Sequence, residues 1–188
     1  MSSTARGYEL SSYATAEKLR RRLGLDANGM ADYLGIDEKT YYRRARLGGL
    51  HGHARWHHRG QPVLYTAVSP SLALLEVLVH IDPRRFEEQT LLRLEIEDDA
   101  EHVTHAQLVQ LLRDAPAGDP EARTRDYGTG WLAEKRTLAL IVPSLVMPFE
   151  NNVILNPLHP AAERTRITAR ERVTLDERLV QRLSPDQP

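Results

Sequence analysis

Three side chains stand where the sequence could build an active site. Arg55 and Trp56 lie in the segment HGHARWHHRG, just before a predicted strand. An arginine can hold a pyrophosphate through paired hydrogen bonds and an indole can stack on a flat ring; a surface arginine beside a core tryptophan is the alternative. Glu76 is the one acid in the apolar run LALLEVLV, where burying a carboxylate costs free energy unless it is paired or used in chemistry.

Two polar positions follow predicted strands. Ser144 comes directly after a buried apolar run and a proline, a placement typical of a site at the end of a strand, with a turn serine as the alternative. Asn156 opens the loop NPLHP, which its prolines make rigid and which either binds a ligand or simply turns the chain. Neither position identifies its chemistry alone.

Several other kinds of chemistry are weak or excluded. The chain has no cysteine, which excludes disulfides, thiolate metal sites and a cysteine nucleophile. Four histidines lie close together, but their spacing is not that of a known metal site and no carboxylate accompanies them, so we expect no bound metal. These are His51, His53, His57 and His58. Ser144 also lacks the turn that carries a hydrolase nucleophile.

Charge is balanced overall but unevenly placed. The 188 residues include 25 Lys and Arg against 26 Asp and Glu, so net charge predicts no general attraction to nucleic acid or membrane. The stretch 39–75 contains no acid and carries six basic side chains with four histidines. It suits an anion, either nucleic acid or a phosphorylated small molecule, or it is simply a solvated basic surface.

Length and hydropathy predict the number of domains and the relation of the chain to membranes. The length suits one domain, or one domain with a small appendage. No apolar run is long enough to span a bilayer, and the N-terminus lacks the apolar core of a signal peptide. We therefore expect a cytoplasmic protein that makes no membrane contact.

The first part of the chain, 1–47, is predicted to be a helical segment. Asp37 is a suitable N-cap for a helix that ends before Gly48, and a shorter helix precedes it. The pair MADYLGIDEKTYYRRARLGG resembles a helix-turn-helix, in which 30–46 would contact DNA. The side chains facing DNA would be Glu38, Lys39, Thr40, Arg43 and Arg44. Such a unit usually binds DNA as a homodimer, and a purely structural appendage is the alternative.

The second part, 48–188, alternates strands and helices. Strands are predicted at 62–68, 92–96, 137–142, 153–155 and 166–175, and helices at 70–81, 106–113 and 127–135. The regular βαβ order and a glycine-rich phosphate loop are both missing from the sequence, so a doubly wound nucleotide fold is not expected. The pattern predicts an α+β fold, with a mixed sheet and flanking helices, preceded by the small helical segment.

Several separated motifs resemble the RES domain family. The segment GGLHGHARWHHRGQPVLYTAVSPSLALLEVLVHID is similar to the family's N-terminal core, and YGTGWL, LALIVPSLVMPFENNVILNPLHP and DERL follow in the family's order. The resemblance implies an ADP-ribosyltransferase-like catalytic domain over 48–188. It further implies a bacterial toxin of a type II toxin–antitoxin system, with NAD⁺ as its substrate and an Xre-type antitoxin as its protein partner.

The resemblance also assigns site residues. Arg55 matches the family's arginine, Tyr65 the tyrosine of its VVYT-like strand, Glu76 its glutamate and Ser144 the serine of its VPS turn. The implied catalytic residues are Arg55, Glu76 and Ser144, and the implied NAD⁺-binding residues are Arg55, Trp56, Tyr65, Ser144 and Asn156. Cleavage between nicotinamide and ribose passes through an oxocarbenium-like cation, which a carboxylate stabilises.

The chain departs from the family pattern at its start. Glu9, in GYELSSYA, stands where the family's first strand carries an arginine, and losing that arginine would weaken phosphate binding. The helical segment is either inserted after this strand or replaces it. Ala54 and His57 stand where the family more often has Gly and Asn.

Three functions follow from these observations. The first is cleavage of NAD⁺ at the nicotinamide–ribose bond by hydrolysis or phosphorolysis. The second is ADP-ribosylation of a protein by the same site. The third is a DNA-binding autoregulator whose RES-like module is inactive. The presence of all four matched side chains favours an enzyme over the third function.

Overall fold

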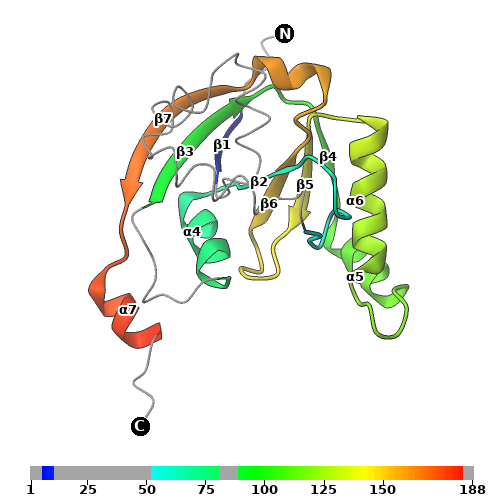
Figure 1. Cartoon of the computed structure of the whole chain (residues 1–188), viewed down its shortest axis with the longest axis horizontal. Coiled ribbons are helices and arrows are strands. Elements are labelled where there is room, and N and C mark those ends of the chain that lie inside the picture. The colour runs from blue at the N-terminus through cyan, green and yellow to red at the C-terminus, as the bar shows by residue number, and fades with distance from the viewer. Residues whose placement is uncertain (1–5, 11–51, 81–88, 184–188) are drawn as a thin grey trace.

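The computed structural model describes residues 6–10, 52–80 and 89–183 of the chain (Figure 1). The predicted helix-turn-helix at 30–46 lies outside the described residues, as does the rest of 11–51. In the described part, no helix is long and apolar enough to cross a membrane.

Seven strands of the described chain form one mixed sheet. They are β1 (Arg6–Leu10), β2 (Leu64–Ala67), β3 (Gln89–Ile96), β4 (Ala100–His102), β5 (Ala139–Pro143), β6 (Asn151–Leu155) and β7 (Arg166–Val173). Their order across the sheet is β4-β5-β6-β2-β1-β3-β7. The β4–β5 pair is parallel and the other neighbours are antiparallel. The sheet curves strongly in Figure 1, with β3 and β7 at one side and β4 and β5 at the other.

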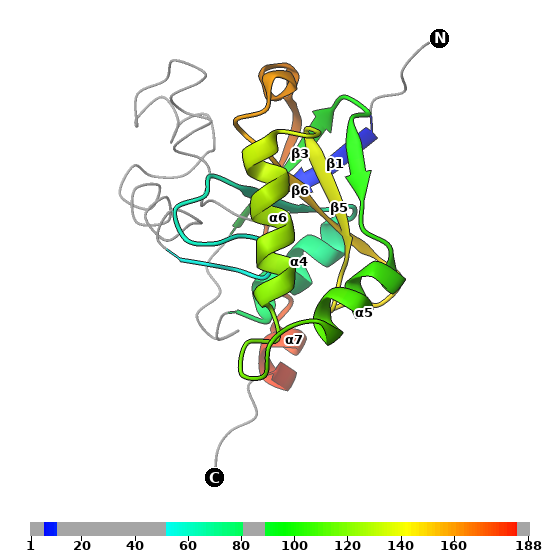
Figure 2. The same cartoon turned by 90° about the vertical axis from the view of Figure 1, so that its right-hand side faces the viewer.

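Helices flank this sheet. They are α4 (Pro70–Leu78), α5 (His105–Arg113), α6 (Ala122–Glu134), the 3₁₀ helix η2 (Pro160–Arg164) and α7 (Glu177–Leu183). Helices α5 and α6 lie together beside β4 and β5, while α4 lies near β2 and β1 (Figure 2). The predicted α+β fold, a mixed sheet with flanking helices, is therefore confirmed.

The core lies on both faces of the central strands. In β5, Leu140 and Val142 pack under α5 and α6 against Trp131. The alternate residues Ala139 and Ile141 pack on the opposite face, in a second cluster with the leucines of β3. Because successive side chains of a strand point to opposite faces, a strand buried on both sides must be apolar throughout, as this one is.

Local sequence explains where α4 begins. Ser69 is its N-cap, with extended backbone and a side chain that accepts a hydrogen bond from the N–H of Leu72 at 3.1 Å. Pro70 takes the first helical position, where its missing N–H has no intrahelical partner to lose. Both features were predicted from the sequence and are confirmed.

Helix α6 begins earlier than its sequence pattern indicates. The prediction placed its start at Tyr127, but the helix begins at Ala122. Its first turns bury polar residues, Thr124 and Arg125, which an apolar pattern does not reveal. Arg125 forms salt bridges to Asp119 and Glu121. These two acids offset the free-energy cost of removing the Arg125 charge from water.

The first strand, β1, belongs to the central sheet. It runs antiparallel between β2 and β3, with Glu9 in register with Ala67 on one side and Arg93 on the other. Residues 6–10 therefore belong to the same sheet as the strands between Leu64 and Val173.

Candidate active site

The carboxylate of Glu76 is the centre of a polar cluster between α4 and the strands β5 and β6. Ser144, directly after β5, donates its hydroxyl to Glu76 Oε1 at 3.0 Å. Asn152 in β6 donates its amide Nδ2 to the same oxygen at 2.6 Å. Hydrogen bonds to an ionised acceptor are the strong ones, so this carboxylate is held in one orientation. The acid in the apolar run is thus paired.

Ser144 uses all of its hydrogen-bonding capacity inside the protein. Its Oγ accepts from the N–H groups of Val146 and Met147 at 3.1 and 3.0 Å while it donates to Glu76. A hydroxyl has one donor and two acceptor positions, and all three are filled. The side chain is only 4% exposed. The geometry therefore favours a role of Ser144 through Glu76 over direct contact with a ligand.

The turn between β5 and β6 is tied to the start of α4. The N-cap Ser69 donates its hydroxyl to Glu150 Oε2 at 2.5 Å, and Ser144 N–H donates to the Glu150 carbonyl at 3.0 Å. One acid thus joins the first turn of the helix that carries Glu76 to the turn that carries Ser144. This contact fixes the two halves of the cluster relative to each other.

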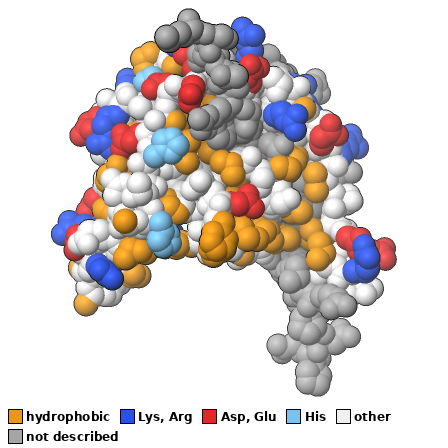
Figure 3. Space-filling view, turned by 180° about the vertical axis from the view of Figure 1, so that it is seen from behind, with side chains coloured by type: hydrophobic (Ala, Val, Ile, Leu, Met, Phe, Trp, Pro, Cys, Tyr) orange, Lys and Arg blue, Asp and Glu red, His pale blue; other side chains and the backbone are white. Residues whose placement is uncertain are grey.

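The same turn carries an exposed apolar rim. Leu145, Met147 and Phe149 are all exposed, and Phe149 has a positive φ of 86°. That backbone region is unfavourable for a residue with a bulky side chain. Figure 3 shows hydrophobic side chains gathered along the lower edge of this side of the molecule.

Tyr65 lies on the same face of the sheet as Asn152. Its partner across the β2–β6 pair is Ile154, and Ala67 pairs with Asn152, so the alternation of side chains places all four on one face. Burial raises the pKa of the Tyr65 phenol, so its hydroxyl stays protonated. The hydroxyl lies 2.8 Å from His57 Nδ1. We assign the phenol as the donor in this bond.

Arg55 is presented by a tight turn docked on α6. Ala54 and His57 pair their backbones at the base of the turn, with N···O distances of 3.1 and 3.2 Å. The Arg55 guanidinium contacts Glu121, just before α6, at 2.8 Å and keeps 32% of its side chain exposed. Trp56 is 3% exposed and packs edge-on against Tyr127, as a core tryptophan.

A glycine of α6 allows this close docking. A side chain on Gly128 would place its Cβ 2.0 Å from the carbonyl oxygen of Trp56, which is well inside contact distance. His58 secures the same contact, because its N–H donates to Thr129 Oγ1 at 3.0 Å and its ring lies 2.8 Å from Asp126. The YGTGWL motif therefore positions Arg55 through the backbone of its neighbour.

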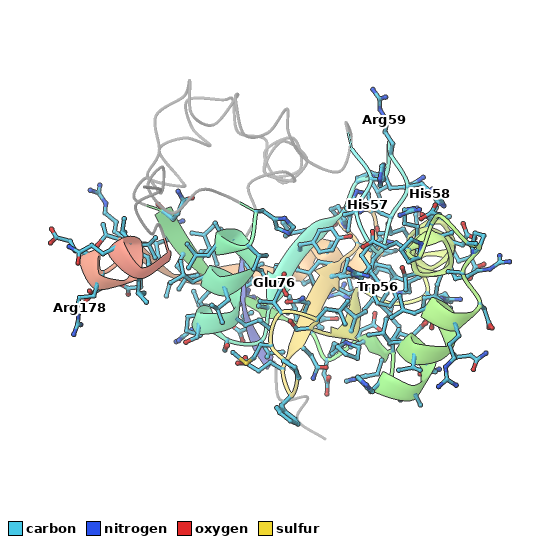
Figure 4. The ribbon with its side chains drawn as sticks, turned by 90° about the horizontal axis from the view of Figure 1, so that it is seen from below. Trp56, His57, His58, Arg59, Glu76 and Arg178 are labelled. Atoms are coloured by element: carbon cyan, nitrogen blue, oxygen red, sulfur yellow. The ribbon has the colours of Figure 1, made fainter. Side chains whose placement is uncertain are left out.

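The structure separates the predicted residues into groups. Glu76 and Ser144 are in direct contact, and Tyr65 shares their sheet face. Figure 4 shows Glu76, a residue of α4, on one side of the central strands, and Trp56 and His57 on the other side, nearer α6. Arg55 belongs to this second group through its turn.

Asn156 stands apart from the cluster. It is fully buried at the other end of β6, where its Nδ2 donates to the Leu132 carbonyl at 2.9 Å and its Oδ1 accepts from the Leu158 N–H at 3.0 Å. Both polar ends of the amide thus hold the NPLHP loop in place.

Sequence reasoning missed two polar residues of the site, Asn152 and Glu121. Asn152 sits at the start of a short strand and Glu121 ahead of a helix, two positions where polar residues are common. Only their partners across the fold distinguish them. In the described part of the chain, no group of three or more His, Cys, Asp or Glu side chains is arranged to hold a metal ion.

Burial makes His57 a source of acid sensitivity. Loss of solvent lowers its pKa from 6.5 to about 4; a backbone hydrogen bond with Gly52 opposes this shift, and His53 and His58 add to it. The unfolded chain therefore takes up this proton before the folded protein does. Stability contributed by neutral His57 is complete above pH 6.5 and is lost as the pH falls toward 4.

We expect His57→Gln to reduce this acid sensitivity. The difference in free energy of unfolding between pH 7 and pH 5 should shrink by about 1–2 kcal/mol. Urea unfolding at the two pH values measures it. His105→Gln is the matched control, because His105 is exposed at the first position of α5. An unchanged difference in His57→Gln would show that protonation of this ring is not coupled to folding.

Separate comparisons with known proteins agree on one family. The RES domain family matches residues 31–176, so part of the predicted helix-turn-helix falls within the matched range. A protein named "Toxin Res" from Pseudomonas putida is 44% identical over 143 residues, covering 74% of this chain and 94% of that protein. A "Prs ADP-ribosylating toxin" from a Sphingobium strain is 30% identical over 133 residues, covering 68% of this chain and 81% of that protein.

A solved structure shares the fold. It is the toxin–antitoxin complex of MbcT and MbcA from M. tuberculosis, matched with a TM-score of 0.51 and 16% identity over 69% of this chain and 75% of the other. At that identity the likeness concerns the fold alone. The sequence match extends over most of the chain, and it includes the segments that carry Arg55, Glu76 and Ser144. The chain therefore belongs to the RES domain family of toxins.

Proposed function

We propose that this protein is a toxin that consumes NAD⁺ by breaking the bond between nicotinamide and ribose. The observation that carries the proposal is the state of the Glu76 carboxylate. Both of its donors, Ser144 and Asn152, bind Oε1. Within the described residues, Oε2 has no hydrogen-bond partner. One oxygen is held by the protein and the other is left for a ligand.

This arrangement suits the chemistry of a glycosidic bond. As nicotinamide leaves, the ribose carbon and its ring oxygen gain positive charge. A fixed carboxylate beside the ribose stabilises that charge without having to reorient at the moment of reaction. The free Oε2 of Glu76 would face the ribose, either to stabilise the cation directly or to orient the acceptor that attacks it. Water and phosphate are both suitable acceptors.

Tyr65 and Ser144 would support this centre. Tyr65 stays a neutral phenol on the same sheet face and would pack against nicotinamide. Ser144 would act by holding the carboxylate, since its own hydrogen-bonding positions are filled. These roles require no metal, and NAD⁺ enters as the substrate.

Arg55 would bind the pyrophosphate of NAD⁺. Its guanidinium is partly exposed and has Glu121 as an acidic partner, so an anionic ligand would compete with or share that contact. We expect Arg55→Gln to raise KM for NAD⁺ by about 10- to 100-fold, the cost of losing a charged hydrogen bond. The effect on kcat should be smaller, because the pyrophosphate does not react.

Steady-state kinetics with NAD⁺ measure this effect. Arg123→Gln removes a guanidinium that is 54% exposed and pairs with Asp126 at 3.6 Å, and it serves as the control with unchanged KM. If Arg55→Gln keeps the KM of the unaltered chain, the pyrophosphate is bound elsewhere.

The activity itself is tested with the purified chain and NAD⁺. Loss of NAD⁺ and release of free nicotinamide are followed with and without inorganic phosphate. Turnover would support the proposed function, and a requirement for phosphate would identify phosphorolysis in place of hydrolysis. A folded chain that leaves NAD⁺ intact under both conditions would refute NAD⁺ cleavage to small acceptors.

ADP-ribosylation of a protein is the second candidate, favoured by the name of the Sphingobium relative. It uses the same bond cleavage and differs in the acceptor. Incubation with labelled NAD⁺ and a bacterial lysate distinguishes the two. Label that becomes covalently attached to protein, with little free ADP-ribose, would indicate a transferase.

We propose an Xre-type antitoxin as the protein partner. Support comes from the solved structure that shares this fold, which is a toxin–antitoxin complex. DNA contact through 30–46, with a homodimer, is also kept as a proposal that rests on the sequence pattern alone. An inactive RES-like module with only this DNA-binding role would leave the Glu76 cluster without a use.

A further inference from the structure

The amide of Asn152 has an orientation that its neighbours dictate. A carboxylate only accepts hydrogen bonds, so the Asn152 NH₂ group must be the part that faces Glu76, at 2.6 Å. Its carbonyl Oδ1 is then directed elsewhere. That oxygen is buried and has no hydrogen-bond partner within the described part of the chain.

This arrangement costs stability. A buried carbonyl that has given up water without gaining a partner is unfavourable, whereas an apolar side chain of similar shape would carry no such cost. The hydrogen bond to Glu76 is what the asparagine provides in return. Stability of the fold therefore does not by itself explain an asparagine at this position.

Asn152 lies at a rigid position, from which its side chain can hold another side chain in place. Asn152 pairs with Ala67 of β2 on one side and with Val142 of β5 on the other, so it lies between two neighbouring strands. Glu76, in contrast, extends from a single helix at the side of the sheet (Figure 4). A long side chain on a helix gains a defined position when a donor on a rigid strand holds it.

We propose that Asn152 is a positioning residue for Glu76 in the NAD⁺-cleaving site. Together with Ser144 it clamps Oε1, which fixes the rotamer of Glu76 and directs Oε2 at the ribose. Asn152 itself makes no contact with the reacting atoms. This inference rests on the proposed function, and its test includes a readout that does not depend on NAD⁺ turnover.

The variant Asn152→Leu removes the amide donor and keeps a similar shape. We expect kcat for nicotinamide release to fall by about 10- to 100-fold, because a misplaced catalytic group loses that much rate. KM for NAD⁺ should change by less than about threefold, since the pyrophosphate contact is untouched. The melting temperature should stay close to that of the unaltered chain, because loss of the hydrogen bond to Glu76 and removal of the unpartnered carbonyl act in opposite directions.

Two further variants control for folding. Asn151→Leu makes the same change at the neighbouring, exposed position of β6 and should leave kcat, KM and melting temperature unaltered. Asn152→Ser removes the amide with a smaller side chain that cannot overfill the site. Its kcat should fall as much as that of Asn152→Leu. A lower melting temperature in both Asn152 variants would indicate a structural role and overturn the proposal.

A double-mutant cycle asks whether Asn152 acts through Glu76. The residual rate of Glu76→Gln is measured with excess enzyme over long incubation, alone and combined with Asn152→Leu. If Asn152 works through the carboxylate, the second change adds little to the first. Losses that multiply would show an independent role, and full kcat in Asn152→Leu would show no role; either outcome refutes positioning.

A crystal structure of Asn152→Leu separates this inference from the proposed function. A Glu76 carboxylate that has left Ser144, or taken several rotamers, supports positioning even if the unaltered chain proves inactive on NAD⁺. A carboxylate that keeps its place against Ser144 without the amide overturns it, whatever the reaction is.

Discussion

Glu76→Gln is expected to lower nicotinamide release from NAD⁺ by about 10²–10³-fold, the cost of removing a fixed charge beside a charged transition state. Glutamine keeps the size of the side chain and can still accept the hydrogen bonds of Ser144 and Asn152 on its carbonyl oxygen. What it loses is the negative charge that opposes the developing cation on the ribose. The change should therefore act on kcat, with KM nearly unaltered.

Rapid-quench or chromatographic measurement of released nicotinamide gives kcat and KM. Glu150→Gln is the informative comparison, because Glu150 binds Ser69 in the same region and, within the described part of the chain, makes no hydrogen bond to Glu76. It should reduce the rate far less. A Glu76→Gln protein that turns over NAD⁺ within a few-fold of the unaltered chain would mean that another group stabilises the cation.

Gly128→Ala is expected to have the largest effect on stability. Alanine favours a helix over glycine, yet the new Cβ would lie 2.0 Å from the carbonyl oxygen of Trp56. The obstacle is backbone, which cannot rotate away as a flexible side chain can, so α6 and the Arg55 turn must separate. We expect a loss of about 2–3 kcal/mol in the free energy of unfolding, from overpacking at a tight contact.

Gly130→Ala provides the matched control within the same helix. Nothing lies within 4 Å of a Cβ built there, and its φ is not positive. That variant should gain about 0.5–1 kcal/mol from helix propensity. Denaturant unfolding of the two variants should therefore shift in opposite directions. If Gly128→Ala is as stable as Gly130→Ala, the turn bearing Arg55 is not packed against α6 as described.

Features that depend on a few neighbouring residues could be predicted from the amino-acid sequence alone. Ser69 and Pro70 predicted the start of α4 because a cap and a first-turn proline act within a few residues. The alternation at 92–96 predicted a strand because one face of it is buried. Glu76 was singled out because an ionisable group in an apolar helix must be paired or used, and the structure pairs it.

Features that depend on a partner far along the chain became visible only in the folded structure. The short polar strand β4 exists because β5 lies beside it, and its sequence carries no strand pattern. Asn152 and Glu121 look like ordinary polar residues until the fold brings them to Glu76 and Arg55. Gly128 looks like a weak point of a helix until Trp56 is seen against it. Propensity and periodicity report a residue's own neighbours, whereas a site is made where the sheet gathers residues that are distant in sequence.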